Sequence, residues 1–310
     1  MTTGRPHIVV DLKEQLGNQL FQFAAAKQLE LDGASIAFSD RTKRIPGAPR
    51  SGHARLEEFT GTTLPLASRW QELATGYLPR TVFKSTFVDF VLSSPIVLPS
   101  IHRILPTLDY EPKPLALPNW SLYRLQGYFQ HRTWFDRSLP SVLASLESTT
   151  RDWRSQLPSF DLCVHLRRGD YVSHGWDLSL DYYIRSLEWM PQHIKSVVVT
   201  SDDQLAALTF SHYLNTNGYD ACVPTEVDSS GQSSVSRPVD PVLYDFCLMV
   251  NAKNIIMSNS SFCWWATALA DSMNVSSNER AVAYPRGWVR LLDDGSDGLV
   301  QPTWTEISQS

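Results

Sequence analysis

The sequence predicts an α/β protein made of two Rossmann-like domains that face a cleft. Its 310 residues exceed what one hydrophobic core usually serves, so two domains are expected. Short apolar runs typical of buried strands alternate with stretches of helical periodicity. Strands that alternate with helices imply parallel sheets covered on both faces. We therefore predict an N-terminal domain over residues 1–150 and a C-terminal domain, with a closing tail, over residues 151–310.

The first half opens with a predicted β-α-β unit. Residues 7–12 form a strand around three consecutive apolar side chains, and a helix is expected to start near Asn18. Residues 35–39 give the second strand. Between residues 42 and 118 prolines are frequent and the periodicity blurs, so no element is predicted there.

The second half alternates regularly. Residues 136–158 read as a helical connection, and 219–238 as a polar, mobile loop. The predicted strands are residues 161–167, 196–200 and 254–257, and the predicted helices are residues 179–189, 241–252 and 261–273.

Composition narrows the classes of function. The formal net charge is -5 and no long run of Lys and Arg occurs, which argues against nucleic acid as the main partner. No stretch approaches the roughly 20 apolar residues of a membrane span. The sequence therefore predicts a cytoplasmic protein without a transmembrane segment, with peripheral association at the inner face of a membrane as an alternative. Four scattered cysteines without a Cys-x-x-Cys pair indicate buried free thiols.

The most informative stretch runs from Cys163 to Tyr171, with the sequence CVHLRRGDY. Strand alternation places His165 and Arg167 on one face, at the carboxyl end where α/β sheets bind ligands. Arg guanidinium groups match phosphate oxygens, so this end suits a diphosphate. The alternative is an Arg–Asp ion pair that only stabilises the turn and has no role in function. Two adjacent arginines at a buried strand end are costly without an anion, which favours the phosphate site.

Two further strand ends carry polar residues. Residues 258–261 (SNSS) crowd a helix start, where backbone N–H groups attract anions, although ordinary N-capping explains them equally. Asp202 and Asp203 could accept hydrogen bonds from a guanine or ribose, or cap the next helix. They do not form an Asp-x-Asp motif, so no metal is expected. The acidic residues 293–297 lack the distal Glu of a calcium loop and read as a surface turn.

The first strand-to-helix junction carries amides. Gly17 permits close approach of a ligand, and Asn18, Gln19 and Gln22 offer donors and acceptors. A plain helix start explains this junction equally well.

Together these segments resemble glycosyltransferase family eleven, the α-1,2-fucosyltransferases. The opening motif LGNQLFQFA starts at Leu16, the middle motif QGYFQ starts at Gln126, and HLRRGDY starts at His165. The segments at residues 134–135, 180–183, 201–203, 259–265, 285–288 and 302–304 follow in the family's order. One departure is Glu14-Gln15, where the family usually has a Gly pair.

The resemblance implies a role for each matching residue. Arg167 would contact the β-phosphate of GDP, and Asn18 would lie near the acceptor hydroxyl. By position alone, Asp170 and Asp177 are candidate catalytic carboxylates close to the two arginines, and Asp170 could instead hold Arg168. The other expected donor-binding residues are His165 at the nucleoside, Arg168, Asp202 or Asp203 at the guanine or ribose, and Ser260, Ser261 and Phe262 along the diphosphate.

The implied activity is an inverting, metal-independent transfer of L-fucose from GDP-fucose to the 2-hydroxyl of a terminal β-galactoside, in surface glycan or O-antigen synthesis. Two Rossmann-like domains facing a cleft are the GT-B arrangement of sugar-nucleotide enzymes. The first domain would bind the acceptor oligosaccharide and the second GDP-fucose. A GDP-sugar transferase of other linkage or donor, and a noncatalytic sugar-binding protein, are the alternatives.

Overall fold

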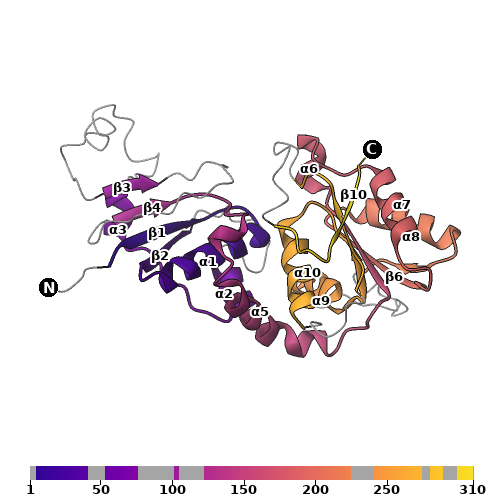
Figure 1. The fold of residues 1–310 in the computed structure, drawn as a ribbon, viewed down its shortest axis with the longest axis horizontal. Helices are drawn as coiled ribbons and strands as arrows, with labels where there is room; N and C mark the ends of the chain where they lie inside the picture. The colour runs from indigo at the N-terminus through magenta and orange to yellow at the C-terminus, as the bar shows by residue number, and fades with distance from the viewer. Residues whose placement is uncertain are drawn as a thin grey trace. The chain divides into compact units, whose positions relative to one another are not determined.

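The computed structural model describes residues 5–40, 53–75, 101–104 (backbone only), 122–224, 240–273, 280–288 and 299–309 (Figure 1). The chain divides into two compact units, Met1–Ser145 and Leu146–Ser310. The division lies inside helix α5 (Leu139–Arg154). The acceptor and donor roles of the two predicted domains stay predictions.

The first unit is built on a four-stranded parallel sheet with the order β2-β1-β4-β3. Its strands are β1 (His7–Leu12), β2 (Ser35–Asp40), β3 (Ile101–Ile104) and β4 (Leu122–Leu125), and its helices are α1 (Leu16–Leu31), α2 (His53–Thr60), α3 (Arg69–Ala74) and the 3-10 helix η1 (Arg132–Trp134). The predicted β-α-β unit is confirmed, with α1 beginning two residues before Asn18. Region 42–118, left without elements by the sequence, contains α2, α3 and β3.

The second unit carries a six-stranded parallel sheet with the order β10-β9-β8-β5-β6-β7. Its strands are β5 (Leu162–Leu166), β6 (Ser196–Ser201), β7 (Asp220–Cys222), β8 (Asn254–Ile256), β9 (Val282–Pro285) and β10 (Thr305–Ile307). Its helices, besides the end of α5, are α6 (Gly169–His174), α7 (Leu180–Trp189), α8 (Gln204–Thr216), α9 (Pro241–Asn251) and α10 (Ser261–Met273). The predicted α/β class with parallel sheets is confirmed; the facing cleft stays a prediction.

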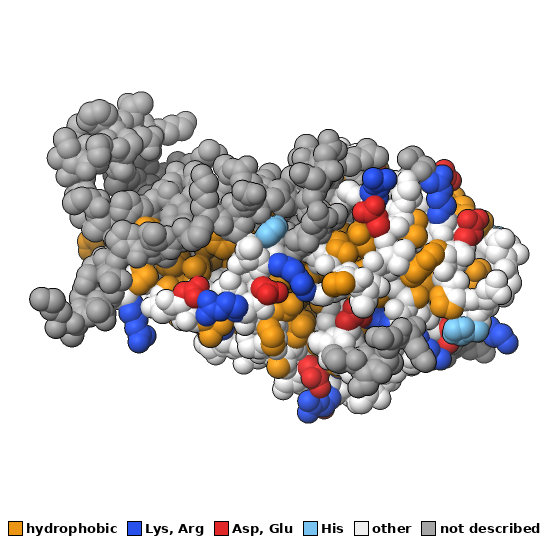
Figure 2. All heavy atoms as spheres, viewed as in Figure 1, with side chains coloured by type: hydrophobic (Ala, Val, Ile, Leu, Met, Phe, Trp, Pro, Cys, Tyr) orange, Lys and Arg blue, Asp and Glu red, His pale blue; other side chains and the backbone are white. Residues whose placement is uncertain are grey.

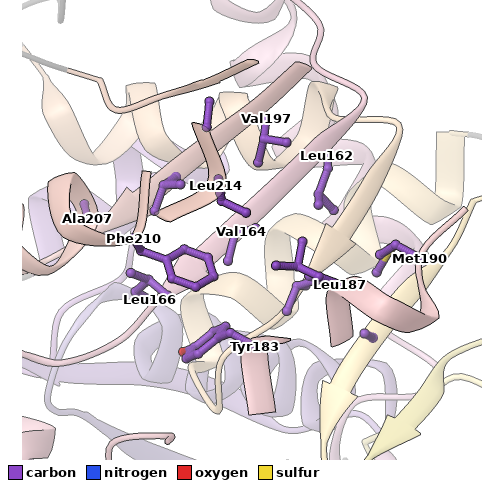
Figure 3. Close-up of a cluster of buried hydrophobic side chains, with 14 of the residues drawn as sticks. Leu162, Val164, Leu166, Tyr183, Leu187, Met190, Val197, Ala207, Phe210 and Leu214 are labelled. Carbon is purple, nitrogen blue, oxygen red and sulfur yellow. The ribbon is translucent and has the colours of Figure 1, made fainter. Parts of the chain in front are cut away.

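The core of the second unit explains why β5 is apolar throughout. Leu162, Val164 and Leu166 project to one face, where side chains of α7 and α8 such as Tyr183 and Phe210 cover them (Figure 3). Alternation sends Cys163 and His165 to the opposite face. Because both faces of the strand are buried, its carboxyl end is held rigidly.

The strand order of this sheet reverses between β5 and β8. From β5 the chain builds outward through β6 and β7, then returns to the other side of β5 and continues through β8, β9 and β10. This is the doubly wound order 3-2-1-4-5-6, whose ligands bind at the carboxyl ends of the two strands that flank the reversal. The residues that follow β5 and β8 are therefore where a ligand-binding site is expected.

Some local expectations were wrong. Residues 219–238 were predicted as loop, but β7 occupies Asp220–Cys222, a strand too short to show periodicity. Helix α6 was not expected, and α8, the helix that Asp202 and Asp203 were expected to precede, was predicted without bounds. Residues 225–238 of that loop and the whole acidic turn at 293–297 lie outside the described residues.

The four cysteines are free thiols; Cys163, Cys247 and Cys263 are buried and Cys222 is half-buried. Burial raises the pKa of Cys247 and of Cys263 to about 12, which keeps both as thiols. In the described part of the chain, no helix has the length and apolar character needed to cross a membrane. On the face drawn in Figure 2, most of the described Lys and Arg side chains lie near Asp or Glu side chains.

Candidate active site

The arginine turn, residues 167–170, leaves the carboxyl end of β5. The Arg167 side chain is only 13% exposed. Its guanidinium lies 2.5 Å from Asp170 Oδ1 and 2.6 Å from Asp202 Oδ2, and 4.9 Å from the centre of the Tyr171 ring. Two ion pairs and an aromatic face thus hold this guanidinium in one orientation at the switch point.

Asp202 organises the turn from the neighbouring strand. Its Oδ1 accepts hydrogen bonds from the backbone N–H groups of Arg168, at 2.8 Å, and Gly169, at 3.2 Å. A Cβ atom at position 169 would stand 2.5 Å from Asp202 Oδ2, so only glycine allows this approach. The Asp202 carboxylate is therefore engaged by the protein itself, and a guanine or ribose contact there stays a prediction.

Arg168 points to other carboxylates. It lies 3.3 Å from Asp177 Oδ2 and 3.4 Å from Asp203 Oδ2. The expectation that Asp170 could hold Arg168 is thus wrong, because Asp170 forms its ion pair with Arg167 instead. Asp203 also caps α8, accepting from the backbone N–H of Ala206 at 3.0 Å, so the capping alternative holds for this residue.

These ion pairs revise the electrostatic argument made from the sequence. The two arginines were expected to need an external anion, yet four carboxylates surround them. Each guanidinium is paired twice within the protein, which offsets the cost of partial burial. Asp170 is the most exposed of the four, at 57%, and is the carboxylate most readily replaced by a ligand phosphate.

His165 lies at the last part of β5 and is 6% exposed. Its Nδ1 is 3.3 Å from Thr200 Oγ1, the residue paired with it in register on β6. Its Nε2 is buried and finds no hydrogen-bond partner in the described part of the chain. Burial lowers the pKa of His165 to about 4, so the imidazole is neutral at pH 7.

The loop after β8, residues 257–260, brings the second set of polar groups to the switch point. Ser258, Asn259 and Ser260 are buried, while Ser261 and Phe262 at the start of α10 are half-buried. Ser258 Oγ and Asn259 Oδ1 have no hydrogen-bond partner among the residues that the structure describes. With His165 Nε2, three buried polar atoms lie on the two strand ends that flank the reversal.

Contacts join this loop to the segment after the arginine turn. Tyr171 donates its hydroxyl proton to the carbonyl oxygen of Asn259 at 3.3 Å, and Asn259 Nδ2 donates to the carbonyl oxygen of Trp176 at 2.9 Å. The structure thus brings together five of the predicted side chains: Arg167, Arg168, Asp170, Asp202 and Asp203. Hydrogen bonds also connect the segment after the arginine turn to residues 257–260, which we call the Ser260 loop. No cluster of three or more His, Cys, Asp or Glu side chains suited to a metal ion occurs within the described ranges.

Asn18 belongs to the first unit, in the first turn of α1. Its Oδ1 accepts a hydrogen bond from Gln130 Nε2 at 2.8 Å. Gln22 Oε1 accepts from the backbone N–H of Lys13, and Gln22 Nε2 donates to the carbonyl oxygen of Gly127. The amides of this junction therefore make specific contacts with the segment after β4, beyond a plain helix start.

Sequence reasoning overlooked several residues that shape these sites. Tyr171 and Thr200 were not assigned, although Thr200 could have been found from the register of β5 with β6. In the first unit, Asp11 and Arg124 form a buried ion pair at 2.5 Å. Arg124 also donates to Ser39 Oγ at 3.1 Å, which ties the carboxyl ends of β1, β2 and β4 together. No sequence motif signals that network.

The strand order and the polar loops at the reversal define the second unit as a doubly wound domain of the Rossmann type. The family described as Glycosyl transferase family 11 matches residues 103–281, more than half of the chain. The chain belongs to this family. The resemblance seen in its sequence motifs is confirmed, and glycosyl transfer is the class of activity that the family supports.

Two curated relatives are from Escherichia coli. The O-antigen biosynthesis glycosyltransferase WbnK is 29% identical over 323 residues, which cover 94% of this chain and 97% of WbnK. An alpha-1,2-colitosyltransferase is 31% identical over 114 residues, 34% of this chain and 35% of the relative.

Similar solved structures are more distant. A mutant of Arabidopsis thaliana FUT1 in complex with GDP has a TM-score of 0.47 and 15% identity, covering 86% of this chain and 68% of that one. Fucosyltransferase NodZ from Bradyrhizobium has a TM-score of 0.42 and 11% identity, covering 86% and 93%.

Proposed function

We propose that the protein is an inverting α-1,2-fucosyltransferase that moves L-fucose from GDP-fucose to the 2-hydroxyl of a terminal β-galactoside without a metal ion. WbnK, the relative matched along almost its whole length, is an O-antigen glycosyltransferase, so we place the reaction in O-antigen synthesis. The acceptor is then a saccharide of that glycan.

The observation that carries the proposal is the switch point of the second unit. Arg167 leaves β5 and the Ser260 loop leaves β8, the two strands between which the order reverses. A diphosphate placed there would meet the Arg167 fork on one side and the N-terminal backbone N–H groups of α10 on the other. The buried atoms His165 Nε2, Ser258 Oγ and Asn259 Oδ1 would gain partners from the nucleotide, each otherwise costing about 1–3 kcal/mol.

These groups suit the chemistry of the leaving group. GDP-fucose is a β-linked donor, so an α-linked product requires in-line attack with inversion at the anomeric carbon, through an oxocarbenium-like state. Negative charge builds on the departing β-phosphate, and Arg167 stabilises it there. To do so, Arg167 exchanges the exposed Asp170 carboxylate for phosphate oxygens while Asp202 continues to hold it.

The acceptor proton has three candidate destinations. Asp170, once released from Arg167, is an exposed carboxylate within reach of the same turn, which suits a general base. The departing phosphate and solvent are the other two. Replacement of Asp170 by Asn separates them, since transfer persists in that variant only if the phosphate or solvent takes the proton.

The test is incubation of the purified protein with GDP-fucose, excess EDTA and lactose or N-acetyllactosamine, with measurement of GDP and of the glycan by NMR. We expect an α-1,2-fucosylated product, and Arg167→Ala should abolish it while circular dichroism stays unchanged. Absence of both product and GDP, with no GDP binding by calorimetry, would contradict the proposal and favour a noncatalytic sugar-binding protein.

The colitosyltransferase relative favours a second candidate, in which the donor is GDP-colitose. The same assay with both donors in competition decides between them. A preference for GDP-colitose would change the assigned sugar and leave the role of Arg167 intact.

A further inference from the structure

The first unit has a strand reversal of its own. Strands β1 and β4 are adjacent, yet β1 continues to β2 on one side, and β3 lies on the other side of β4. Residues 13–15, which lead into α1, follow β1, and residues 126–131 follow β4. These two segments therefore meet at the carboxyl edge of the sheet, at the kind of position where open α/β sheets bind ligands.

Three side-chain hydrogen bonds join the segment 126–131 to β1 and to α1, the helix that follows residues 13–15. Gln126 Nε2 donates to Asp11 Oδ2 at 2.5 Å, and Gln22 Nε2 donates to the carbonyl oxygen of Gly127 at 3.1 Å. The third runs from Gln130 Nε2 to Asn18 Oδ1 at 2.8 Å. Both partners of this third bond, the amide pair Asn18–Gln130, are half-buried.

Backbone strain marks the same two segments. Among the described residues, two that are not glycine have positive φ: Glu14, at 61°, and Phe129, at 53°. A side chain in this region costs on the order of 1–2 kcal/mol. Burial of the Phe129 ring against Trp134, with centroids 5.1 Å apart, maintains the strain directly before Gln130.

The hydrogen bond fixes which end of the Asn18 amide is free. A carboxamide has an acceptor oxygen and a donor nitrogen on opposite sides. Because Gln130 donates to the oxygen, the Nδ2 group of Asn18 is left to donate elsewhere, and within the described residues it has no partner. The edge of the sheet therefore presents an N–H donor suited to a substrate oxygen.

We propose that Gln130 is a positioning residue that orients Asn18 so that its Nδ2–H donates to the oxygen of the acceptor hydroxyl. This inference rests on the proposed function, and on the position near the acceptor hydroxyl that the sequence resemblance implies for Asn18. A fixed donor holds the nucleophilic oxygen in one position, and a misplacement of about 1 Å can cost roughly 100-fold in rate.

Gln130→Glu tests the inference with almost no change of shape. A carboxylate cannot donate, so the Asn18 amide turns over to donate to Glu, and its oxygen then faces the acceptor. We expect kcat to fall by about 10- to 100-fold, with the KM for GDP-fucose unchanged. In Gln130→Ala, which leaves the Asn18 side chain free to rotate, kcat should decrease less than in Gln130→Glu.

The control is Gln28→Glu, which removes a similar hydrogen bond between α1 and the carbonyl oxygen of Thr133, away from Asn18. It should keep wild-type kcat. In an Asn18→Ala background, Gln130→Glu should cause no further loss, since its effect acts through Asn18. Wild-type kcat in Gln130→Glu, or a full additional loss in the Asn18→Ala background, would overturn the inference.

A readout without turnover separates this inference from the proposed function. If the wild type transfers no sugar from either donor, the proposed function fails. The side-chain amide signals of Asn18 in ¹⁵N NMR still report the bond: Gln130→Glu should shift them and Gln28→Glu should not. Unshifted Asn18 signals in Gln130→Glu would overturn the positioning role.

Discussion

Gly169→Ala should disrupt the arginine turn through a single added methyl group. The new Cβ would stand 2.5 Å from Asp202 Oδ2 and 3.2 Å from its Cγ, so the carboxylate must move. It then loses its bonds from the N–H groups of Arg168 and Gly169 and its ion pair with Arg167. Hydrogen bonds to charged groups contribute about 1.5–3 kcal/mol each, so we expect a loss of about 3 kcal/mol in unfolding free energy after water solvates part of the exposed turn.

Urea unfolding followed by circular dichroism measures this loss, and the transfer assay measures its effect on Arg167. A displaced guanidinium should lower kcat/KM by roughly 100-fold. Gly175→Ala is the matched control at the end of the same short helix. Its φ of 65° makes the substitution strained by about 1–2 kcal/mol, but its Cβ would meet nothing within 4 Å. It should therefore destabilise the protein without affecting Arg167.

A double-mutant cycle isolates the cause. In an Asp202→Ala background the carboxylate that the new methyl group would meet is absent. Gly169→Ala should then lower the unfolding free energy little further than Asp202→Ala alone does. Wild-type stability and turnover in Gly169→Ala, or a full additional loss in the Asp202→Ala background, would refute the explanation.

Three other predictions follow from single residues. Glu14→Gly should raise the unfolding free energy by about 1 kcal/mol because it relieves a positive φ, whereas Glu14→Ala should not; chemical denaturation distinguishes them. Burial lowers the pKa of His165 from 6.5 to about 4, so the folded state binds this proton less readily. Stability is then fully present above pH 6.5 and decreases by up to about 3 kcal/mol as pH falls to 4; His165→Gln should flatten that part of the pH profile, and an unchanged profile would contradict the burial. Asp203→Ala should cost about 1 kcal/mol of unfolding free energy through loss of the α8 cap, which Asp203→Asn should largely retain; equal losses in both would argue against capping.

The sequence predicts the strongly patterned parts of this fold. Strand β5 and helix α10 were expected nearly as observed, because long apolar runs and a polar helix start are local signals. Strand β7 and helix α6 were not, because a three-residue strand has no period, and the start of α6 depends on Asp202 receiving the N–H groups of the turn.

The same distinction applies to the candidate site. Arg167 and the Ser260 loop are visible in the sequence because motif and position coincide at strand ends. Their partners are not, since pairing of Arg167 with Asp202, or of Gln130 with Asn18, depends on which strands become neighbours. The expectation that the arginines need an external anion went wrong for this reason. The carboxylates that neutralise them include two from the next strand end, Asp202 and Asp203.

We propose that Arg167, at the reversal between β5 and β8, binds the β-phosphate of GDP. Calorimetric titration of GDP and of GMP into the wild type and into Arg167→Ala tests it most directly. We expect the variant to bind GDP at least about tenfold more weakly while GMP, which lacks the β-phosphate, binds both proteins alike. Equal GDP affinity in the two proteins, or no GDP binding by the wild type, would contradict the claim.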